Sequence, residues 1–156
     1  MGQSGRVLFT KEDFVSGEEI IEQLSRENSA FSFHLRFIDE TGYKNYPTVK
    51  HAVGNISNSD RTNQLIIYIY AHWNPSKYLD FEWDAEGYYT SIYIEDVGYG
   101  DQVLLPFLLH LLRLYPRAKV WIDYDWFYTL ADLELLATRL DRREVWYEVN
   151  PKEFYL

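Results

Sequence analysis

Apolar and polar residues alternate along several stretches of the chain, the pattern of β-strands that bury one face. Residues 31–38 alternate up to Phe37, and in residues 64–73 Leu65, Ile67, Ile69, Ala71 and Trp73 fall on one face. Residues 79–84 and 88–95 also alternate, and the Glu-Gly pair between them suits a two-residue hairpin turn. Further strands are expected at 6–10, 46–55, 119–124 and 145–149.

Other segments have the apolar spacing of helices. These helices are expected near 16–27, 102–115 and 129–140. Ser16 and Glu19 form a capping box at the start of the first, and Thr129 with Asp132 suits the start of the last. The middle helix is apolar almost all round, so other elements must cover it on most sides.

Together these elements predict an α+β fold in a single domain, residues 1–156. The sheet should be predominantly antiparallel, with about five to seven strands and a meander over residues 64–96. The helix at 102–115 connects the strands 88–95 and 119–124. Because such connections are right-handed, we expect one right-handed parallel crossover there.

Sorting side chains onto two faces predicts the strand registers of the meander. Pairing Ala85 with Tyr88, and Trp73 with Leu79, gathers the apolar residues on one face. The other face then carries carboxylates between tyrosines. Its members are Asp80, Glu82, Asp84, Glu95, Tyr68, Tyr70, His72, Tyr89 and Tyr93.

Negative charge is concentrated in this part of the chain. The net charge is -9 at pH 7, and residues 78–112 hold seven carboxylates without a single Lys or Arg. Residues 1–77 and 113–156 are nearly neutral. A strongly acidic protein repels phosphates, so we expect no nucleic-acid partner and favour a basic protein partner.

The absence of cysteine and of long apolar segments indicates in which cellular compartment the protein is expected. Cysteine is absent, which excludes disulfides and thiolate metal sites and suits a reducing cytoplasm. The first ten residues lack the pattern of a signal peptide, and the apolar run Val103 to Leu112 is too short to cross a bilayer. We therefore expect a cytoplasmic protein with no membrane role.

The acidic face of the meander is the leading candidate for a binding site. Tyrosine is enriched at protein interfaces. Like charges along a strand destabilise the fold, and ordinary surfaces intersperse both signs. Binding to a basic partner would explain that cost. The alternative interpretation is the solvated outer face of an antiparallel sheet.

Catalytic chemistry has less support in the sequence. Carboxylates at positions i and i+2 of a strand lie roughly 7 Å apart, too far to share one metal ion. The histidines are scattered, and no serine lies in a Gly-x-Ser-x-Gly elbow. We assign no catalytic residue, metal or cofactor. An alternative aromatic and acidic cleft is predicted at a strand end, around Asp123, Asp125, Trp121 and Trp126.

The sequence thus predicts a binding protein and leans away from an enzyme. The leading hypothesis is an acidic module that docks on and neutralises a basic partner, such as a bacterial immunity protein that inhibits a toxin nuclease. One alternative is an enzyme or small-ligand-binding domain that uses the cleft around Asp123 and Asp125. Another is a structural subunit or scaffold.

Overall fold

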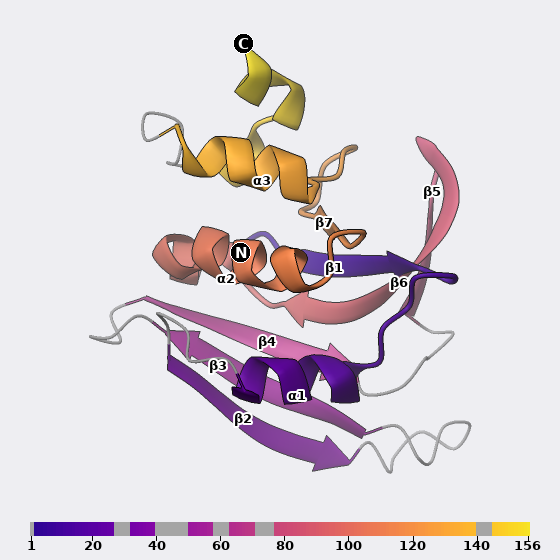
Figure 1. The fold of residues 1–156 in the computed structure, drawn as a ribbon, viewed down its shortest axis with the longest axis vertical. Helices are drawn as coiled ribbons and strands as arrows, with labels where there is room; N and C mark the ends of the chain where they lie inside the picture. The colour runs from indigo at the N-terminus through magenta and orange to yellow at the C-terminus, as the bar shows by residue number, and fades with distance from the viewer. Residues whose placement is uncertain (1, 27–31, 40–49, 58–62, 71–76, 140–144) are drawn as a thin grey trace.

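The structure, a computed structural model, describes residues 2–26, 32–39, 50–57, 63–70, 77–139 and 145–156 (Figure 1). Strands and helices in this part of the chain form the predicted α+β fold. The strands are β1 (Gly5–Thr10), β2 (Ser32–Asp39), β3 (Lys50–Ser57), β4 (Gln64–Tyr70), β5 (Tyr78–Phe81), β6 (Asp84–Ile94) and β7 (Lys119–Trp121). The helices are α1 (Gly17–Arg26), α2 (Asp101–Leu114) and α3 (Leu130–Ala137), with short 3₁₀ helices η2 (Val97–Gly100), η4 (Trp146–Glu148) and η5 (Pro151–Tyr155).

The seven strands form one sheet of order β2-β3-β4-β6-β1-β7, and β5 pairs with β6 beside this path. Each neighbouring pair runs antiparallel, which confirms the predominantly antiparallel sheet. Strands β6 and β7 lie on either side of β1 and both oppose its direction, so they point the same way. The handedness of the α2 connection between them stays a prediction.

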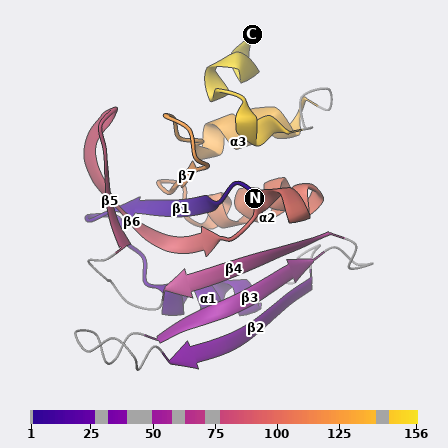
Figure 2. The same ribbon diagram turned by 180° about the vertical axis from the view of Figure 1, so that it is seen from behind.

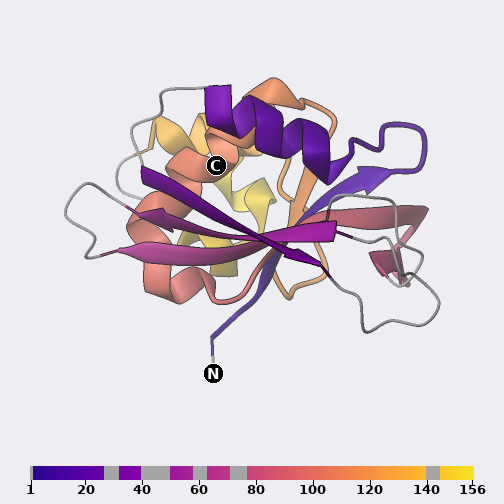
Figure 3. The same ribbon diagram turned by 90° about the horizontal axis from the view of Figure 1, so that it is seen from below.

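Helices α1 and α2 cover one face of the sheet (Figures 1 and 2). Figure 3 shows α1 lying on one side of β2, β3 and β4. Ile20 and Leu24 of α1 belong to the core, together with Leu65, Ile67 and Ile69 of β4 and Ile92 and Ile94 of β6. We call the opposite side of the sheet, which neither helix covers, the outer face.

The apolar surface of α2 is covered on most sides, as its sequence requires. Its buried residues are Val103, Leu104, Leu105, Phe107, Leu108, Leu109, Leu111 and Leu112. Helix α3 packs beside α2, and the Arg113 guanidinium donates to both oxygens of Glu134 at 2.7 and 2.8 Å. Within the described residues, no helix has both the length and the apolar character needed to cross a membrane.

A β-bulge in β6 changes which side chains reach the outer face. Val7 pairs with Ile92 and the next residue of β1, Leu8, pairs with Thr90, so Ser91 is the extra residue. Ile92 lies in the core. Beyond a bulge the alternation of side chains is shifted by one. Thr90 consequently points to the outer face rather than to the core side.

The predicted register of the hairpin between β5 and β6 is wrong. Leu79 pairs with Tyr88 and Phe81 with Asp84, so the chain turns at residues 82–83 and not at the Glu-Gly pair. Strand β4 pairs directly with β6 instead of with β5. Trp73, which the predicted pairing requires, lies outside the described residues.

The observed register has a tertiary cause. The observed register sets Phe81 opposite Asp84, an apolar against a polar residue, so local alternation alone does not select it. In the observed register the Phe81 ring contacts Trp121 and Phe127, at centroid distances of 4.8 and 5.2 Å. Aromatic contacts between distant segments therefore decide the pairing.

The strand predicted at 145–149 is also wrong, because η4 occupies this segment. Val145 adopts a left-handed conformation with φ of 50°. Trp146 is 1% exposed, and its ring meets Tyr128 edge-on at 5.0 Å. Burial of this large ring outweighs the preference of the flanking valines for extended backbone.

We predict that Gly100→Ala destabilises the protein, because the new Cβ would lie 2.8 Å from the Gln64 carbonyl oxygen and 2.5 Å from the Leu65 side chain. Overpacking of this kind costs about 1–3 kcal/mol in the free energy of unfolding. Gly98→Ala is the control, because its Cβ would meet only Asp96 Oδ1, at 3.3 Å. Urea denaturation should show a clearly lower midpoint for the first variant than for the second, and equal midpoints would contradict this packing.

Candidate functional site

The hairpin of residues 78–87 carries much of the acidic segment. Asp80, Glu82, Asp84 and Glu86 lie on it without any Lys or Arg among them. We call it the acidic hairpin. It extends beyond β4 and arches toward the end of the molecule where β7 lies (Figures 1 and 2). Three of its carboxylates, those of Asp80, Glu82 and Glu86, belong to exposed residues.

Glycine is needed at one point of this hairpin. Tyr78 crosses over Gly87, so that a Cβ at position 87 would collide with the Tyr78 hydroxyl group. Tyr78 and Tyr89 face each other with ring centroids 4.9 Å apart. The hydrogen bond from Tyr78 to Asp80 raises the pKa of the Tyr78 phenol. The open side of the hairpin is therefore covered in part by its own tyrosine.

An aromatic cluster fixes the hairpin to the outer face. Its members are Phe81, Trp83, Tyr88, Trp121 and Phe127. The Phe127 ring lies 4.4 Å from Trp83, 5.2 Å from Phe81 and 4.9 Å from Tyr88, measured between centroids. Tyr88 is 1% exposed although it lies outside the main core. The cluster is thus a second, smaller core beneath the hairpin.

The Tyr88 hydroxyl group connects the cluster to charged residues. It lies 3.2 Å from Asp84 Oδ2 and 3.1 Å from Glu86 Oε2, and it accepts a hydrogen bond of 3.0 Å from Lys119 Nζ. The Lys119 ammonium also lies 5.1 Å from the ring centroids of both Tyr88 and Phe127. Burial, followed by the two carboxylates, raises the pKa of Tyr88. The phenol therefore keeps its proton and donates it toward the acidic hairpin.

The predicted docking residues are divided between two places. Asp80, Glu82 and Asp84 all lie on the acidic hairpin, but not on one face as predicted. Asp80 pairs with Gly87, whereas the next residue, Phe81, pairs with Asp84, so the side chains of Asp80 and Asp84 point to opposite faces. Glu95 lies elsewhere, where its carboxylate accepts a hydrogen bond of 3.3 Å from the Tyr68 hydroxyl group.

The tyrosines of the predicted site do not share one face. Tyr68 and Tyr93 form a pair on the outer face, with centroids 6.0 Å apart. Tyr70 lies under Lys77, whose Nζ is 4.7 Å from the ring centroid. Tyr89 instead contacts Phe14 at 5.9 Å, on the side of α1, because the bulge at Ser91 reverses the alternation. His72 lies outside the described residues.

Two residues absent from the predicted docking set connect its two parts. Trp121 contacts Phe81 of the hairpin, and Arg6 pairs with both Trp121 and Tyr93 across the neighbouring strands. The Arg6 guanidinium lies 4.9 Å from the Tyr93 ring and 6.0 Å from the Trp121 ring. The outer face is therefore continuous from Trp83 to Tyr68. The density of aromatic residues at 121–128 was the available signal for this arrangement.

The four residues of the alternative cleft lie in one short segment, in which both tryptophans contact Tyr124. The Trp121 indole donates to the Tyr124 carbonyl at 2.8 Å, whereas Trp126 stacks on the Tyr124 ring and donates to the Tyr128 hydroxyl. Asp123 has a left-handed backbone with φ of 58° and accepts hydrogen bonds from Ser4. Asp125 is exposed. The two carboxylates therefore differ, since Asp123 is bonded to Ser4 and Asp125 is exposed.

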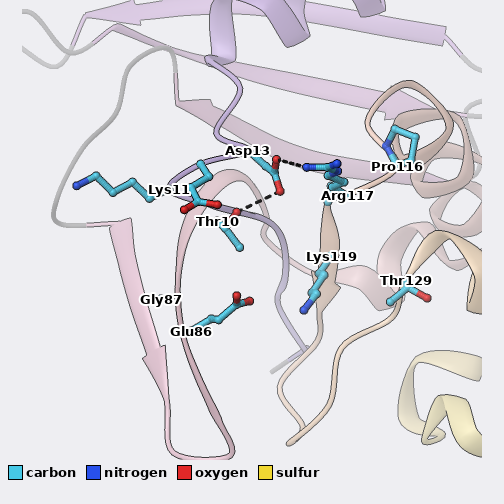
Figure 4. Close-up of a pocket in the computed structure, with 11 residues that line it drawn as sticks. Thr10, Lys11, Asp13, Glu86, Gly87, Pro116, Arg117, Lys119 and Thr129 are labelled. Carbon is cyan, nitrogen blue, oxygen red and sulfur yellow. Dashed lines mark hydrogen bonds and ion pairs between the residues drawn. The ribbon is translucent and has the colours of Figure 1, made fainter.

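An open groove of about 480 Å³ lies beside the base of the hairpin (Figure 4). Its lining includes the charged residues Lys11, Glu12, Asp13, Glu86, Arg117 and Lys119. Arg117 forms an ion pair of 3.0 Å with Asp13, which also accepts a hydrogen bond of 3.3 Å from Thr10. Positive and negative groups balance along the groove, and none of the four residues of the alternative cleft lines it.

Comparisons with known proteins add no relative. No family model, curated protein or solved structure matches the chain. Among the described residues, no three His, Cys, Asp or Glu side chains are grouped so as to hold a metal ion. The geometry of the outer face is therefore the basis on which a function can be proposed.

We predict that Phe127→Ala frees the acidic hairpin, because it removes three ring contacts worth about 0.5–1.5 kcal/mol each. Amide hydrogen exchange at residues 78–87 should accelerate by at least about tenfold, equivalent to about 1.4 kcal/mol. Tyr124→Ala is the control, because its ring stacks on Trp126. If both variants exchanged alike at the hairpin, the aromatic cluster would not be what holds it.

The Tyr88 phenol makes stability depend on pH at the alkaline end. Its pKa is raised in the folded state, so below pH 10 both states keep the proton and this group contributes no slope. Above about pH 10 the unfolded state loses the proton first, and the free energy of unfolding falls by up to about 1.4 kcal/mol per pH unit. Denaturation of Tyr88→Phe between pH 9 and about 12 should show a shallower fall. An unchanged slope would argue against this role.

Proposed function

We propose that this protein is a binding module that docks on a basic protein through the acidic hairpin and the aromatic residues beside it. The observation that carries the proposal is the hairpin itself, with four carboxylates, no basic residue and a tryptophan at its turn. Summed charge of one sign attracts an oppositely charged surface and raises the rate of association.

The aromatic residues supply what charge alone does not. Trp83 at the turn is 36% exposed and Tyr78 is 40% exposed. Tryptophan and tyrosine are the residues in which binding energy concentrates when a partner surrounds them. Carboxylates around such rings match the usual arrangement of a protein–protein interface, in which a polar rim surrounds a centre that loses its water on binding. Charge would then set the speed of association, and the rings would set the lifetime of the complex.

Contacts with the rest of the fold also support the hairpin before binding. The Phe127 ring contacts both Phe81 and Trp83, and Lys119 bonds to Tyr88 at the hairpin base. A surface that is ordered in advance loses less conformational entropy on binding. This property suits a fast and tight inhibitor of an enzyme.

The specific form of the proposal is a bacterial immunity protein in the cytoplasm, which neutralises a toxin such as a nuclease. A nuclease needs a basic surface to bind its phosphate substrate, and an acidic hairpin is complementary to such a surface. The alternative enzyme function around Asp123 and Asp125, and the scaffold function, have less support. Asp123 is bonded to Ser4, and none of the four residues of the alternative cleft lines the groove.

The proposal predicts that charge removal on the hairpin weakens association. A partner captured from the source cells with the tagged protein would be purified, and its binding rates measured at low and high salt. The triple variant Asp80→Asn, Glu82→Gln, Asp84→Asn should lower the association rate constant by about tenfold or more at low ionic strength. It should also reduce the salt dependence of that rate.

A matched control removes three carboxylates elsewhere. Glu22, Glu148 and Glu153 are exposed and lie away from the hairpin in sequence, so Gln at these positions changes the net charge equally. This control should keep most of the wild-type rate. Equal loss in both triple variants would show a general charge effect, and no loss in the hairpin variant would refute docking through it.

A further inference from the structure

Arg6 lies on the outer face without an ion pair among the described residues, which is unusual in an acidic protein. Its guanidinium lies near the rings of Tyr93 and Trp121, at 4.9 and 6.0 Å from their centroids. Nη1 donates to the Thr90 hydroxyl at 3.4 Å, which is a long hydrogen bond. Nε is buried and has no hydrogen-bond partner within the part of the chain that the structure describes.

The neighbouring carboxylates do not neutralise Arg6. Glu95 and Asp123 lie two residues beyond its strand partners Tyr93 and Trp121. Glu95 accepts from the Tyr68 hydroxyl, and Asp123 accepts from Ser4. Among the described residues Arg6 forms no ion pair, although acids outnumber bases by 24 to 15 in the chain.

We propose that Arg6 is the anchor of a carboxylate subsite, which takes an Asp or Glu side chain of the partner protein. The guanidinium presents several N–H donors in a plane that matches the two oxygens of a carboxylate. The flanking rings exclude water on its faces, which strengthens a charge-assisted bond. Arginine, tryptophan and tyrosine are the residues most enriched at the interface positions that contribute most of the affinity.

Charge complementarity identifies this occupant. The acidic hairpin requires cations on the partner, whereas Arg6 requires an anion, and Trp121 joins the two places. A basic partner with one carboxylate opposite Arg6 satisfies both. Such alternation fixes the orientation of the partner and rejects basic proteins that lack the carboxylate. The subsite extends the proposed function. It rests on that proposal in one respect only, namely that the carboxylate belongs to a partner protein.

The test needs no partner. The probe is acetyl-glutamate amide, a blocked glutamate with one negative charge, titrated into the full chain at constant ionic strength and followed by NMR. We expect saturable shifts at Arg6, Thr90 and Tyr93 and at the Trp121 indole N–H. The neutral acetyl-glutamine amide should give none. Arg6→Met should abolish the response, and Arg6→Lys should weaken it because the planar fork is lost.

A second variant tests the electrostatic argument in the opposite direction. Glu95→Gln removes a negative charge that lies on the same face, so binding of the charged probe should become about threefold tighter. This variant keeps Arg6 and its ring contacts. It therefore separates loss of the subsite from loss of folding.

Several results would overturn the subsite. Equal shifts with the charged and neutral probes, or shifts that persist in Arg6→Met, would show that no carboxylate is recognised. Tighter binding of inorganic phosphate would assign Arg6 to a phosphate instead. Self-association that Arg6→Met abolishes would assign it to a second copy of this chain. None of these results bears on docking through the hairpin. Conversely, if the hairpin variants bound the partner as fast as the wild type, the expected result of the probe titration would stay the same.

Discussion

The outer face depends on one extra residue in β6. Ser91 breaks the alternation of side chains between Ile92 and Thr90, so that both faces of this strand become buried near its middle. Without the bulge, Thr90 would follow Ile92 into the core. With it, Tyr88 and Thr90 join Leu8 on the side opposite α1 and α2 and are buried there. The bulge thus creates the second core on which the hairpin lies.

This arrangement divides the acidic segment into groups with different roles. Asp96 accepts a hydrogen bond of 2.9 Å from Gly98 N and so caps η2. Asp101 opens α2, where a negative charge is favourable. Glu95 is bonded to Tyr68. The remaining carboxylates lie on the hairpin, which is why a count over the whole segment overstated the size of a single acidic face.

Sequence reasoning was successful where the governing interactions are local. The Thr129 and Asp132 capping box is present with both of its hydrogen bonds, and Ser16 accepts from Glu19 N as expected. The helices agree with their predicted ranges to within a few residues. Apolar periodicity and capping act within one or two turns of the chain, so they can be recognised from the sequence.

The candidate site was predicted only in part, because its geometry is set by contacts between distant segments. The register of β5 is chosen by Phe81 against Phe127, and the bulge is chosen by packing on both faces of β6. Asp80, Glu82 and Asp84 were predicted to share one face, but the chain turns at a different place and the side chains of Asp80 and Asp84 point to opposite faces of the hairpin. Arg6 and Lys119 could not be recognised, because their roles depend on rings that come from other strands.

The position of β5 has an evolutionary consequence. Strands β4 and β5 occupy one edge of β6 in succession, and β4 alone adjoins the main core. The hairpin can therefore lengthen, shorten or exchange its outward residues while the packing of α1 and α2 is preserved. Selection on such a peripheral element can alter which protein is recognised at little cost to folding, so related chains would diverge first in residues 78–87.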